Sequence, residues 1–238
     1  MTGWTLKRFW TTAMIEAVDA GWQIMLDGKA VHTPAKAQLI VPTRPLAEAI
    51  GVEWDAQEDE VDPRTMPLTR SANSALDKVT PQFEEVAALV SEYGGSDQLC
   101  YRAEGPDALI QRQAEAWDPL LDWAASGLDA PLTMASGVMH VPQPAKSLTA
   151  LKARVDTMTP FELTALHDLV GLSGSLIIGL AVVENVLPSE ELWRRSRIDE
   201  TWQQEQWGVD EEAAATVALK RQEFLNAVRF FRLLRPIE

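Results

Sequence analysis

The first part of the chain alternates polar and apolar residues, a pattern typical of strands that bury one face. Between two such segments, Asp27 and Gly28 tolerate the positive φ of a tight turn, so the pattern predicts a β-hairpin. A further short strand ends at Pro42, and a segment near the N-terminus supplies one more. The four predicted strands cover residues 7–15, 22–26, 30–33 and 39–41, and together they form a small antiparallel sheet.

After this region the apolar positions recur every three to four residues, which predicts helices. Thr43 is a candidate N-cap and Pro45 falls in the first turn of the first predicted helix. Leu46, Ile50 and Trp54 share one face of that helix, so we expect this face to be buried.

The later segments begin with comparable signals, of which the clearest is a capping box formed by Thr159 and Glu162, with Pro160 at the first helical position. Prolines bracket a non-helical connector over residues 132–145, in which residues 137–141 read as a short extended piece. The remaining predicted helices cover residues 68–79, a segment that starts at 81, and residues 107–125, 147–158, 159–186, 189–207 and 210–233.

These elements predict an α+β fold with two domains. Residues 1–80 form a small N-terminal domain that contains the sheet, and residues 81–238 form a larger all-helical C-terminal domain. The apolar run at residues 169–183 is interrupted by Gly and Ser, and it is shorter than the roughly 20 residues that cross a bilayer. We therefore expect it to be a buried helix.

The composition narrows the functional classes. With 46% apolar and 24% charged residues, the chain is typical of a folded globular protein. Its 21 basic and 35 acidic residues give a net charge of −14, which argues against nucleic acids and anionic membranes as partners. Cys100 is the single cysteine, so no internal disulfide forms and a reducing compartment is favoured. The N-terminal residues resemble neither a signal nor a transit peptide, so we expect a bacterial cytoplasmic protein.

Catalytic signatures are weak throughout the chain. His32, His140 and His167 lie far apart without the spacing of metal ligands, so we expect no metal site. The segment 171–175 is rich in Gly and Ser, but it matches no phosphate-binding pattern and is better explained by close helix packing. Cys100 reads as a buried apolar side chain, and the paired glutamates are typical of a solvated helix face. We predict neither a catalytic residue nor a cofactor.

Tryptophan is unusually frequent, with nine in the chain, and Trp193, Trp202 and Trp207 lie close to a run of acids. Tryptophan anchors and neighbouring acids suit a protein-binding surface, because the rings supply contact area and the acids steer a basic partner. A core helix with a charged outer face explains the same pattern, so both interpretations stay open. The acids of this run are Asp199, Glu200, Glu205, Asp210, Glu211 and Glu212.

Five separated motifs occur in the order and spacing of one known family. They are Arg8-Phe9-Trp10, residues 26–35, Glu53-Trp54-Asp55-Ala56-Gln57, Met66-Pro67-Leu68-Thr69-Arg70 with Asn73, and Gln204-Glu205-Gln206-Trp207-Gly208. Together they resemble the assembly chaperones for the alpha subunit of the ATP synthase head, known from mitochondria and alphaproteobacteria. The resemblance implies a monomer without catalytic activity that binds unassembled alpha at the surface later covered by beta. It also implies a mitochondrial matrix location for eukaryotic relatives.

The same resemblance suggests which residues matter. An acidic residue soon after the Trp-Gly pair is associated with function in this family, so Glu211 is the first candidate for partner binding and Glu212 the second. Trp54 matches a family position, and its place on the buried face of its helix favours a role in folding. Further candidates are Glu205, Trp207 and Asp210 for partner binding, and Arg70 and Asn73 for the junction between the domains.

Two other functions compete with this one. A small-molecule-binding protein or enzyme would place its pocket in a cleft between the two domains, where polar groups converge. A general holdase would protect unrelated unfolded proteins as well as alpha. A broad, partly apolar surface rimmed by acids would instead favour the assembly chaperone.

Overall fold

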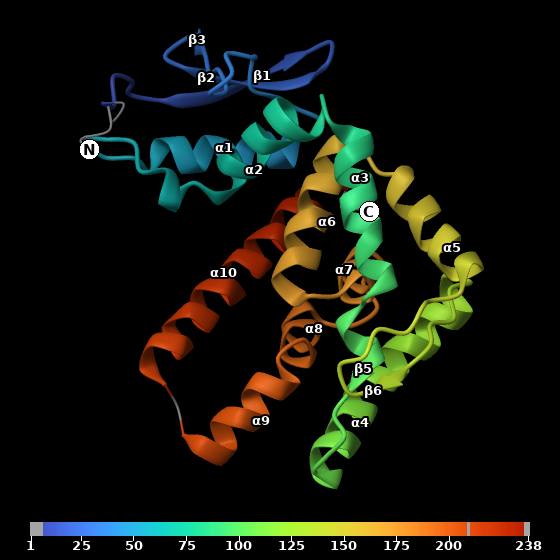
Figure 1. Cartoon of the computed structure of the whole chain (residues 1–238). Coiled ribbons are helices and arrows are strands. Elements are labelled where there is room, and N and C mark those ends of the chain that lie inside the picture. The colour runs from blue at the N-terminus through green and yellow to red at the C-terminus, as the bar shows by residue number, and fades with distance from the viewer. Residues whose placement is uncertain (1–6, 209, 236–238) are drawn as a thin grey trace. The chain divides into compact units, whose positions relative to one another are not determined.

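The computed structural model describes residues 7–208 and 210–235 and contains two compact units (Figure 1). Within these residues, the first unit comprises 7–83, 159–165 and 229–235, and the second comprises 84–158, 166–208 and 210–228. The predicted α+β fold, with a small sheet near the N-terminus and a larger helical part after it, is confirmed. The predicted division into two domains, 1–80 and 81–238, stays a prediction, because these units are defined by contacts within the folded chain.

Six strands and ten α-helices are assigned within the described residues. The strands are β1 Ala13–Val18, β2 Gly21–Leu26, β3 Lys29–Ala30, β4 Ile40–Val41, β5 Tyr101–Arg102 and β6 Ala135–Ser136. The helices are α1 Arg44–Asp55, α2 Pro67–Ser74, α3 Phe83–Glu92, α4 Asp107–Gly127, α5 Ala145–Asp156, α6 Pro160–Ser173, α7 Leu176–Val183, α8 Ser189–Arg195, α9 Ile198–Trp207 and α10 Glu211–Leu233. Among the described residues, every helix is too short or too polar to span a bilayer.

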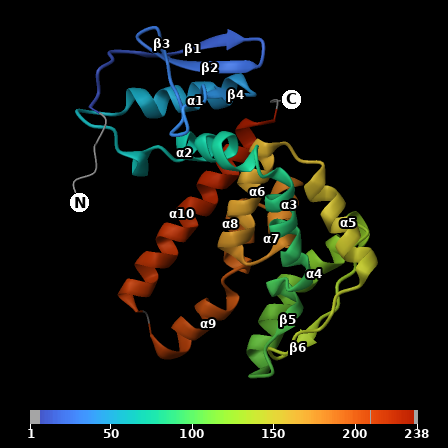
Figure 2. The same cartoon turned by 45° about the horizontal axis from the view of Figure 1, so that its top comes forward.

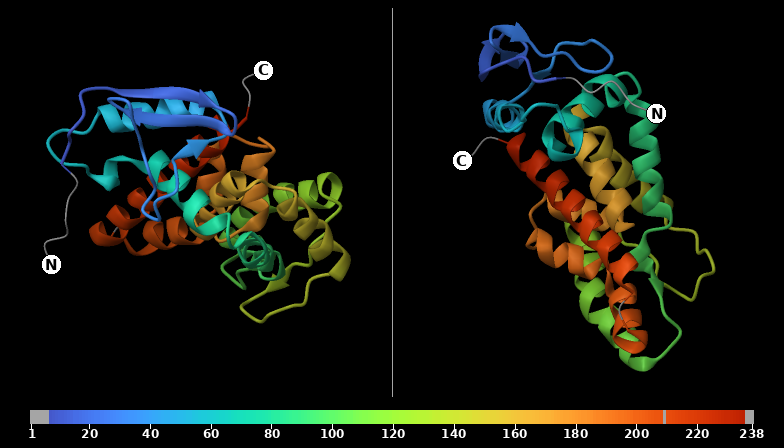
Figure 3. Two further views of the ribbon diagram at one scale, coloured as in Figure 1. Left: turned by 90° about the horizontal axis from the view of Figure 1, so that it is seen from above. Right: turned by 90° about the vertical axis from the view of Figure 1, so that its left-hand side faces the viewer.

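The sheet of the first unit is built around β2, which pairs antiparallel with β1, β3 and β4 and lies with β1 across α1 (Figure 2 and Figure 3). Leu26 pairs with Lys29, so Asp27 and Gly28 form a two-residue loop with φ values of 45° and 79°. The predicted hairpin is therefore confirmed.

The N-terminal strand is displaced from its prediction. We expected it at residues 7–15, but β1 begins at Ala13. The Asp27 carboxylate accepts hydrogen bonds from the backbone N–H groups of Thr11 (2.8 Å) and Thr12 (3.0 Å), which engages these amides with a side chain instead of the β ladder. The segment predicted at 30–33 is also shorter, since β3 ends at Ala30 and His32 makes only a single bridge to Gln38.

Helix α1 begins as predicted, because the Thr43 hydroxyl accepts the N–H of Leu46 at 3.4 Å. Its buried residue Glu53 caps a second helix. The Glu53 carboxylate accepts the backbone N–H groups of Leu68 and Thr69 at the start of α2, each at 2.8 Å, and the Thr69 hydroxyl at 2.7 Å. The N-cap residue of α2, Met66, makes no side-chain cap bond, so Glu53 satisfies amides that α2 itself leaves open.

The capping box at the start of α6 is confirmed, because Thr159 N–H donates to Glu162 at 2.9 Å and Glu162 N–H donates to the Thr159 hydroxyl at 3.3 Å. The single helix predicted over residues 159–186 is wrong. The chain breaks at Gly174, with φ 76°, and the Ser175 hydroxyl then caps α7 by accepting the N–H of Ile178 at 3.0 Å.

The break also allows close packing within the second unit. A Cβ placed on Gly179 of α7 would stand 2.7 Å from a Val170 methyl and 2.9 Å from a Leu166 methyl on α6. The small residues of this apolar run therefore let two helices approach each other, which agrees with the packing interpretation of the sequence. The expected single buried helix at residues 169–183 is instead the end of α6 and the whole of α7.

The single helix predicted over residues 189–207 is also wrong, since α8 ends at Arg195 and α9 begins at Ile198. Side chains from elsewhere take the carbonyls at the bend. Trp117 Nε1 donates to the Arg195 carbonyl at 2.8 Å, and Gln98 Nε2 donates to the Ser196 carbonyl at 2.9 Å. These tertiary bonds replace the bonds that a continuous helix would have made.

The predicted connector is non-helical up to residue 144, since α5 begins at Ala145, and its extended piece is β6 at Ala135–Ser136 and not residues 137–141. Strand β6 pairs parallel with β5. The Gln143 amide fixes the connector through two bonds to Thr133, accepting its N–H at 2.7 Å and donating to its carbonyl at 2.9 Å. These bonds join the two ends of the connector on either side of β6.

Replacing Glu53 by Ala leaves the amides of Leu68 and Thr69 without their acceptor inside the protein. We expect the free energy of unfolding to fall by about 2–4 kcal/mol. Chemical denaturation measures the change. Glu48→Ala on the same helix removes only the exposed ion pair with Arg44, so a comparable loss in that control would contradict a special role for Glu53.

Asp97 is fully buried and accepts the N–H groups of Leu99 and Ile177, each at 3.0 Å. Burial raises the pKa of Asp97 to about 6 against its hydrogen bonds, which lower it. The folded state therefore binds an extra proton between about pH 4 and pH 6, and stability falls as the pH rises through this window.

Between pH 4 and pH 7, the free energy of unfolding of the wild-type chain should fall by about 2.4 kcal/mol relative to that of Asp97→Asn, since each pKa unit corresponds to about 1.4 kcal/mol. Urea denaturation of both chains at several pH values tests this. A stability difference that is independent of pH would show that Asp97 keeps its ordinary pKa.

Candidate functional site

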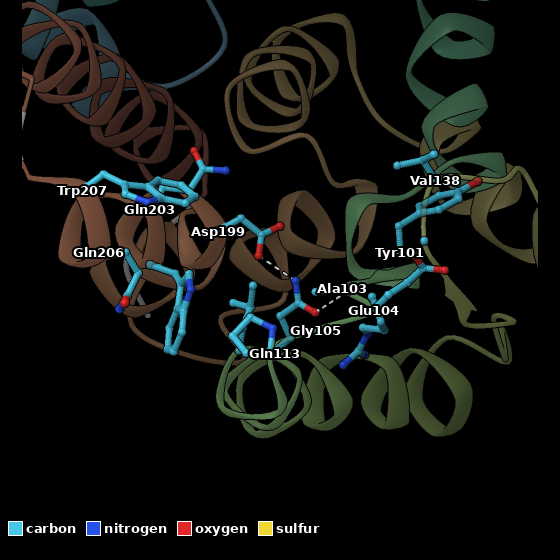
Figure 4. Close-up of a pocket in the computed structure, with 15 residues that line it drawn as sticks. Tyr101, Ala103, Glu104, Gly105, Gln113, Val138, Asp199, Gln203, Gln206 and Trp207 are labelled. Carbon is cyan, nitrogen blue, oxygen red and sulfur yellow. Dashed lines mark hydrogen bonds between the residues drawn. The ribbon is translucent and has the colours of Figure 1, made fainter.

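The second unit contains an open cleft of about 700 Å³ (Figure 4). We call it the aromatic cleft because Tyr101, Trp202 and Trp207 lie along it. Figure 4 shows Trp207 and Gln203 on one side and Tyr101 and Val138 on the other. The lining comprises residues 101–106, Leu109 and Gln113 of α4, Gly137 and Val138 after β6, and Asp199, Trp202, Gln203, Gln206 and Trp207 of α9.

The base of the aromatic cleft is held by one buried side-chain amide, that of Gln113, which is 1% exposed. Its Oε1 accepts the backbone N–H of Ala103 at 2.8 Å, and its Nε2 donates to Asp199 Oδ1 at 2.6 Å (Figure 4). Gln113 therefore ties the chain after β5 and the first turn of α9 to α4. Sequence reasoning missed this residue, although a glutamine on the stripe that also carries Trp117 and Leu120 is a detectable signal.

An ion pair makes a second link between α4 and α9. Arg112 Nη1 donates to Glu205 Oε2 at 2.6 Å, and Nη2 donates to Oε1 at 3.0 Å. The Arg112 hydrogen bond lowers the pKa of Glu205 and keeps it ionised. Both oxygens of this predicted partner-binding residue thus face a cation of the same chain. The part of Glu205 in partner binding stays a prediction.

The three tryptophans that the sequence grouped together take different positions. Trp193 is buried and contacts Phe224, with ring centroids 5.3 Å apart. Trp202 is half-buried on the wall of the aromatic cleft. Trp207 is 80% exposed at the end of α9. The sequence left two interpretations open, a core helix and a protein-binding surface. Trp193 lies in the core, and Trp207 has the exposed position that suits binding of a partner.

The acids that follow α9 are all exposed at the start of α10. Asp210 Oδ1 accepts the N–H groups of Glu212 at 2.9 Å and Ala213 at 3.2 Å, so Asp210 caps the helix. Glu211 and Glu212 lie in the first turn, where the helix dipole favours negative charge. Their side chains are free of this capping role, which leaves them as the candidate partner-binding acids. Their role in binding remains a prediction.

Trp54, Arg70 and Asn73 line a smaller cavity of about 240 Å³ in the first unit. Trp54 is buried and makes an edge contact with Trp10, with centroids 5.3 Å apart, which fits the folding role expected of it. Asn73 is half-buried on α2, and Arg70 is exposed on the same helix. The predicted role of Arg70 and Asn73 at a domain junction stays a prediction.

The other candidates for chemistry are structural. His167 is exposed and its Nδ1 lies 3.1 Å from Asp168, whose hydrogen bond raises the pKa of the imidazole. Cys100 is buried, as expected, and desolvation raises its thiol pKa to about 12, which keeps it protonated and unreactive. Across residues 7–208 and 210–235, no cluster of His, Cys, Asp and Glu has the make-up of a metal site.

Known proteins match this chain over most of its length. The model of the ATP12 chaperone protein family matches residues 7–125. The solved structure of Atp12 from Paracoccus denitrificans is 50% identical and superimposes with a TM-score of 0.94, covering 96% of this chain and 98% of that one. An aspartate-to-lysine mutant of the same P. denitrificans protein is 49% identical, with the same coverage and TM-score. The mitochondrial protein atp12 of Schizosaccharomyces pombe is 22% identical over 221 residues, 88% of this chain and 76% of its own length.

The α+β fold is thus shared with a class of chaperones. This chain belongs to the ATP12 chaperone protein family, as the sequence motifs indicated. Family membership supports a chaperone role in ATP synthase assembly, through binding of a synthase subunit.

Replacing Gln113 by Leu removes the bridge between Ala103 and Asp199 while keeping the side chain about the same size. We expect the free energy of unfolding to fall by about 1–3 kcal/mol, and the Ala103 amide to exchange its hydrogen faster. Gln111→Leu, which removes an exposed bond to Glu115, is the matched control. Equal exchange at Ala103 in both variants would mean that Gln113 does not hold the cleft.

Proposed function

We propose that this chain binds the unassembled alpha subunit of the ATP synthase head and covers the surface that later contacts beta. The single observation that carries the proposal is the exposed Trp207, which stands at the aromatic cleft and is followed directly by the exposed acids Asp210, Glu211 and Glu212. An exposed tryptophan next to solvent-exposed acidic side chains is typical of a protein-binding surface. Membership in the chaperone family supports the same conclusion.

The physical need for such a protein follows from the nature of permanent interfaces. A surface that will be buried between two subunits is apolar, and it aggregates while it is unpaired. A chaperone for that surface has to cover it, yet it has to bind less tightly than the true partner, so that the beta subunit replaces it. The exposed apolar area of the aromatic cleft provides contact without deep enclosure of the partner.

The negative charge of this chain guides its association with the alpha subunit. The chain carries a net charge of −14, and the acids at the start of α10 form a local negative patch next to Trp207. We expect this patch to speed association with a basic region of alpha and to weaken at high salt. In this proposal the chain makes no covalent bond, needs no cofactor, acts as a monomer and works in the bacterial cytoplasm.

The test is the aggregation of isolated alpha subunit, followed by light scattering with and without the chain. An equimolar amount of the chain should suppress the scattering in the absence of nucleotide, and adding beta should release alpha into a complex with beta. Absence of protection would contradict the proposal. Equal protection of unrelated unfolded proteins would contradict it as well and would favour a general holdase.

The acids of α10 are tested by replacing Glu211 and Glu212 with Lys. Because the change reverses two charges on the patch, we expect the concentration needed for half-protection of alpha to rise at least about tenfold at low salt. Glu84→Lys with Glu85→Lys makes the same charge change at two exposed positions in the first turn of α3. An equal loss in both double variants would assign the effect to net charge alone.

A further inference from the structure

The cations next to the aromatic cleft are neutralised within the chain. Arg102 Nη2 lies 2.7 Å from Asp118 Oδ1, and its guanidinium is largely buried. Arg112 is engaged with Glu205 through two hydrogen bonds. Neither guanidinium is therefore available to balance another charge in the cleft.

Two carboxylates in the lining of the cleft are not paired with a cation in this way. The ion pairs found within residues 7–208 and 210–235 include neither Glu104 nor Asp199, and Glu104 is exposed to solvent. The bond that Asp199 accepts comes from the Gln113 amide, which is neutral and leaves the negative charge in place. The aromatic cleft consequently keeps two uncompensated negative charges, one on each of its facing walls (Figure 4).

The rings beside these carboxylates favour the same kind of ligand. Tyr101, Trp202 and Trp207 line the cleft, and the face of an aromatic ring attracts a cation. The Tyr101 hydroxyl is fixed by a 3.2 Å hydrogen bond with His140 Nδ1. Among natural cations, a guanidinium best combines stacking on aromatic rings with paired hydrogen bonds to carboxylates.

The surroundings indicate that this cation is part of a polypeptide. Val138 lines the cleft and is 94% exposed, and the next residue, Met139, is 77% exposed. Met134, at the other end of β6, is 55% exposed. Apolar side chains thus continue the surface beyond the carboxylates, which suits a segment with apolar residues on both sides of its charged residue.

We infer that the aromatic cleft receives an arginine side chain on an extended, apolar segment of the alpha subunit, an assignment that rests on the proposed function. The guanidinium lies between the rings of the cleft and the carboxylates of Glu104 and Asp199. The neighbouring apolar side chains of the segment contact Val138 and Met139.

Isothermal titration calorimetry with the full chain tests this inference. The probes are the blocked pentapeptide Ala-Leu-Arg-Leu-Ala and the same peptide with citrulline, which keeps the shape of arginine but lacks its charge. We expect the arginine peptide to bind at least about tenfold more tightly, because only a charged ligand balances the two carboxylates. A lysine peptide should lie between the two, because its ammonium cannot bridge them as a planar fork does.

The double variant Glu104→Gln and Asp199→Asn removes both charges, and Asn keeps an oxygen for the Gln113 bond. The preference for arginine over citrulline should then fall close to one. Glu84→Gln with Glu85→Gln removes the same number of negative charges at exposed positions on α3 and should leave the preference unchanged.

Equal binding of the two peptides by the parent chain, or an unchanged preference in the Glu104/Asp199 variant, would overturn the inference. Light scattering with alpha separates this failure from that of the proposed function. A chain that protects alpha without any preference for arginine keeps the function and loses the cleft assignment. A chain that prefers arginine but does not protect alpha keeps a cation-binding cleft and loses the proposed partner.

Discussion

The side-chain amide of Gln113 reaches two segments that lie far from it in sequence, and the form of the aromatic cleft depends on it. Because the amide is buried, both of its hydrogen bonds are made without competition from water, and losing either would leave a polar group unpaired. It holds the N–H of Ala103 on one wall and the carboxylate of Asp199 on the other. A neutral group in this position fixes the walls without cancelling the charge that the cleft presents.

In the first unit, a buried charged side chain likewise connects distant segments through hydrogen bonds. Glu53 reaches from α1 to the buried first amides of α2, and the neighbouring Gln57 donates to the Glu53 carbonyl and accepts the N–H of Asp62. Asp55 accepts the N–H of Ala13 at the start of β1. Three residues of one family motif therefore connect helices and strand within the first unit. The motif identifies the family through residues that stabilise the fold.

Features with local causes could be predicted from the sequence. The hairpin at Asp27 and Gly28, the cap at Thr43 and the capping box at Thr159 depend on groups a few residues apart. The bend after Arg195 could not be predicted, because the carbonyls of Arg195 and Ser196 bond to side chains from distant segments. The break at Gly174 has a local signal, a glycine at positive φ followed by the Ser175 cap, which the sequence interpretation missed. Propensity favours a continuous helix through Arg195, and tertiary hydrogen bonds override it there.

For the candidate site too, some features could be predicted from the sequence and others could not. The sequence indicated that tryptophans and acids meet near residue 207, but not which of them are exposed. Glu205 looks equivalent to Glu211 in sequence, yet its partner Arg112 lies 93 residues away. The bond from Gln113 to Asp199 spans 86 residues. Such pairs arise from the packing of α4 against α9, which no local pattern records.

Gln98 connects the two bends that interrupt the predicted helices, one through its backbone and the other through its side chain. Its backbone N–H donates to the Gly174 carbonyl at 3.3 Å, and its side-chain amide donates to the Ser196 carbonyl at 2.9 Å. A Cβ at position 174 would stand 2.6 Å from the Gln98 side-chain oxygen, so any larger residue there would push Gln98 away from Ser196 as well. Because one residue bonds at both bends, we expect a fluctuation that loosens the start of α7 to weaken the contact that holds the start of α9, which forms a wall of the cleft.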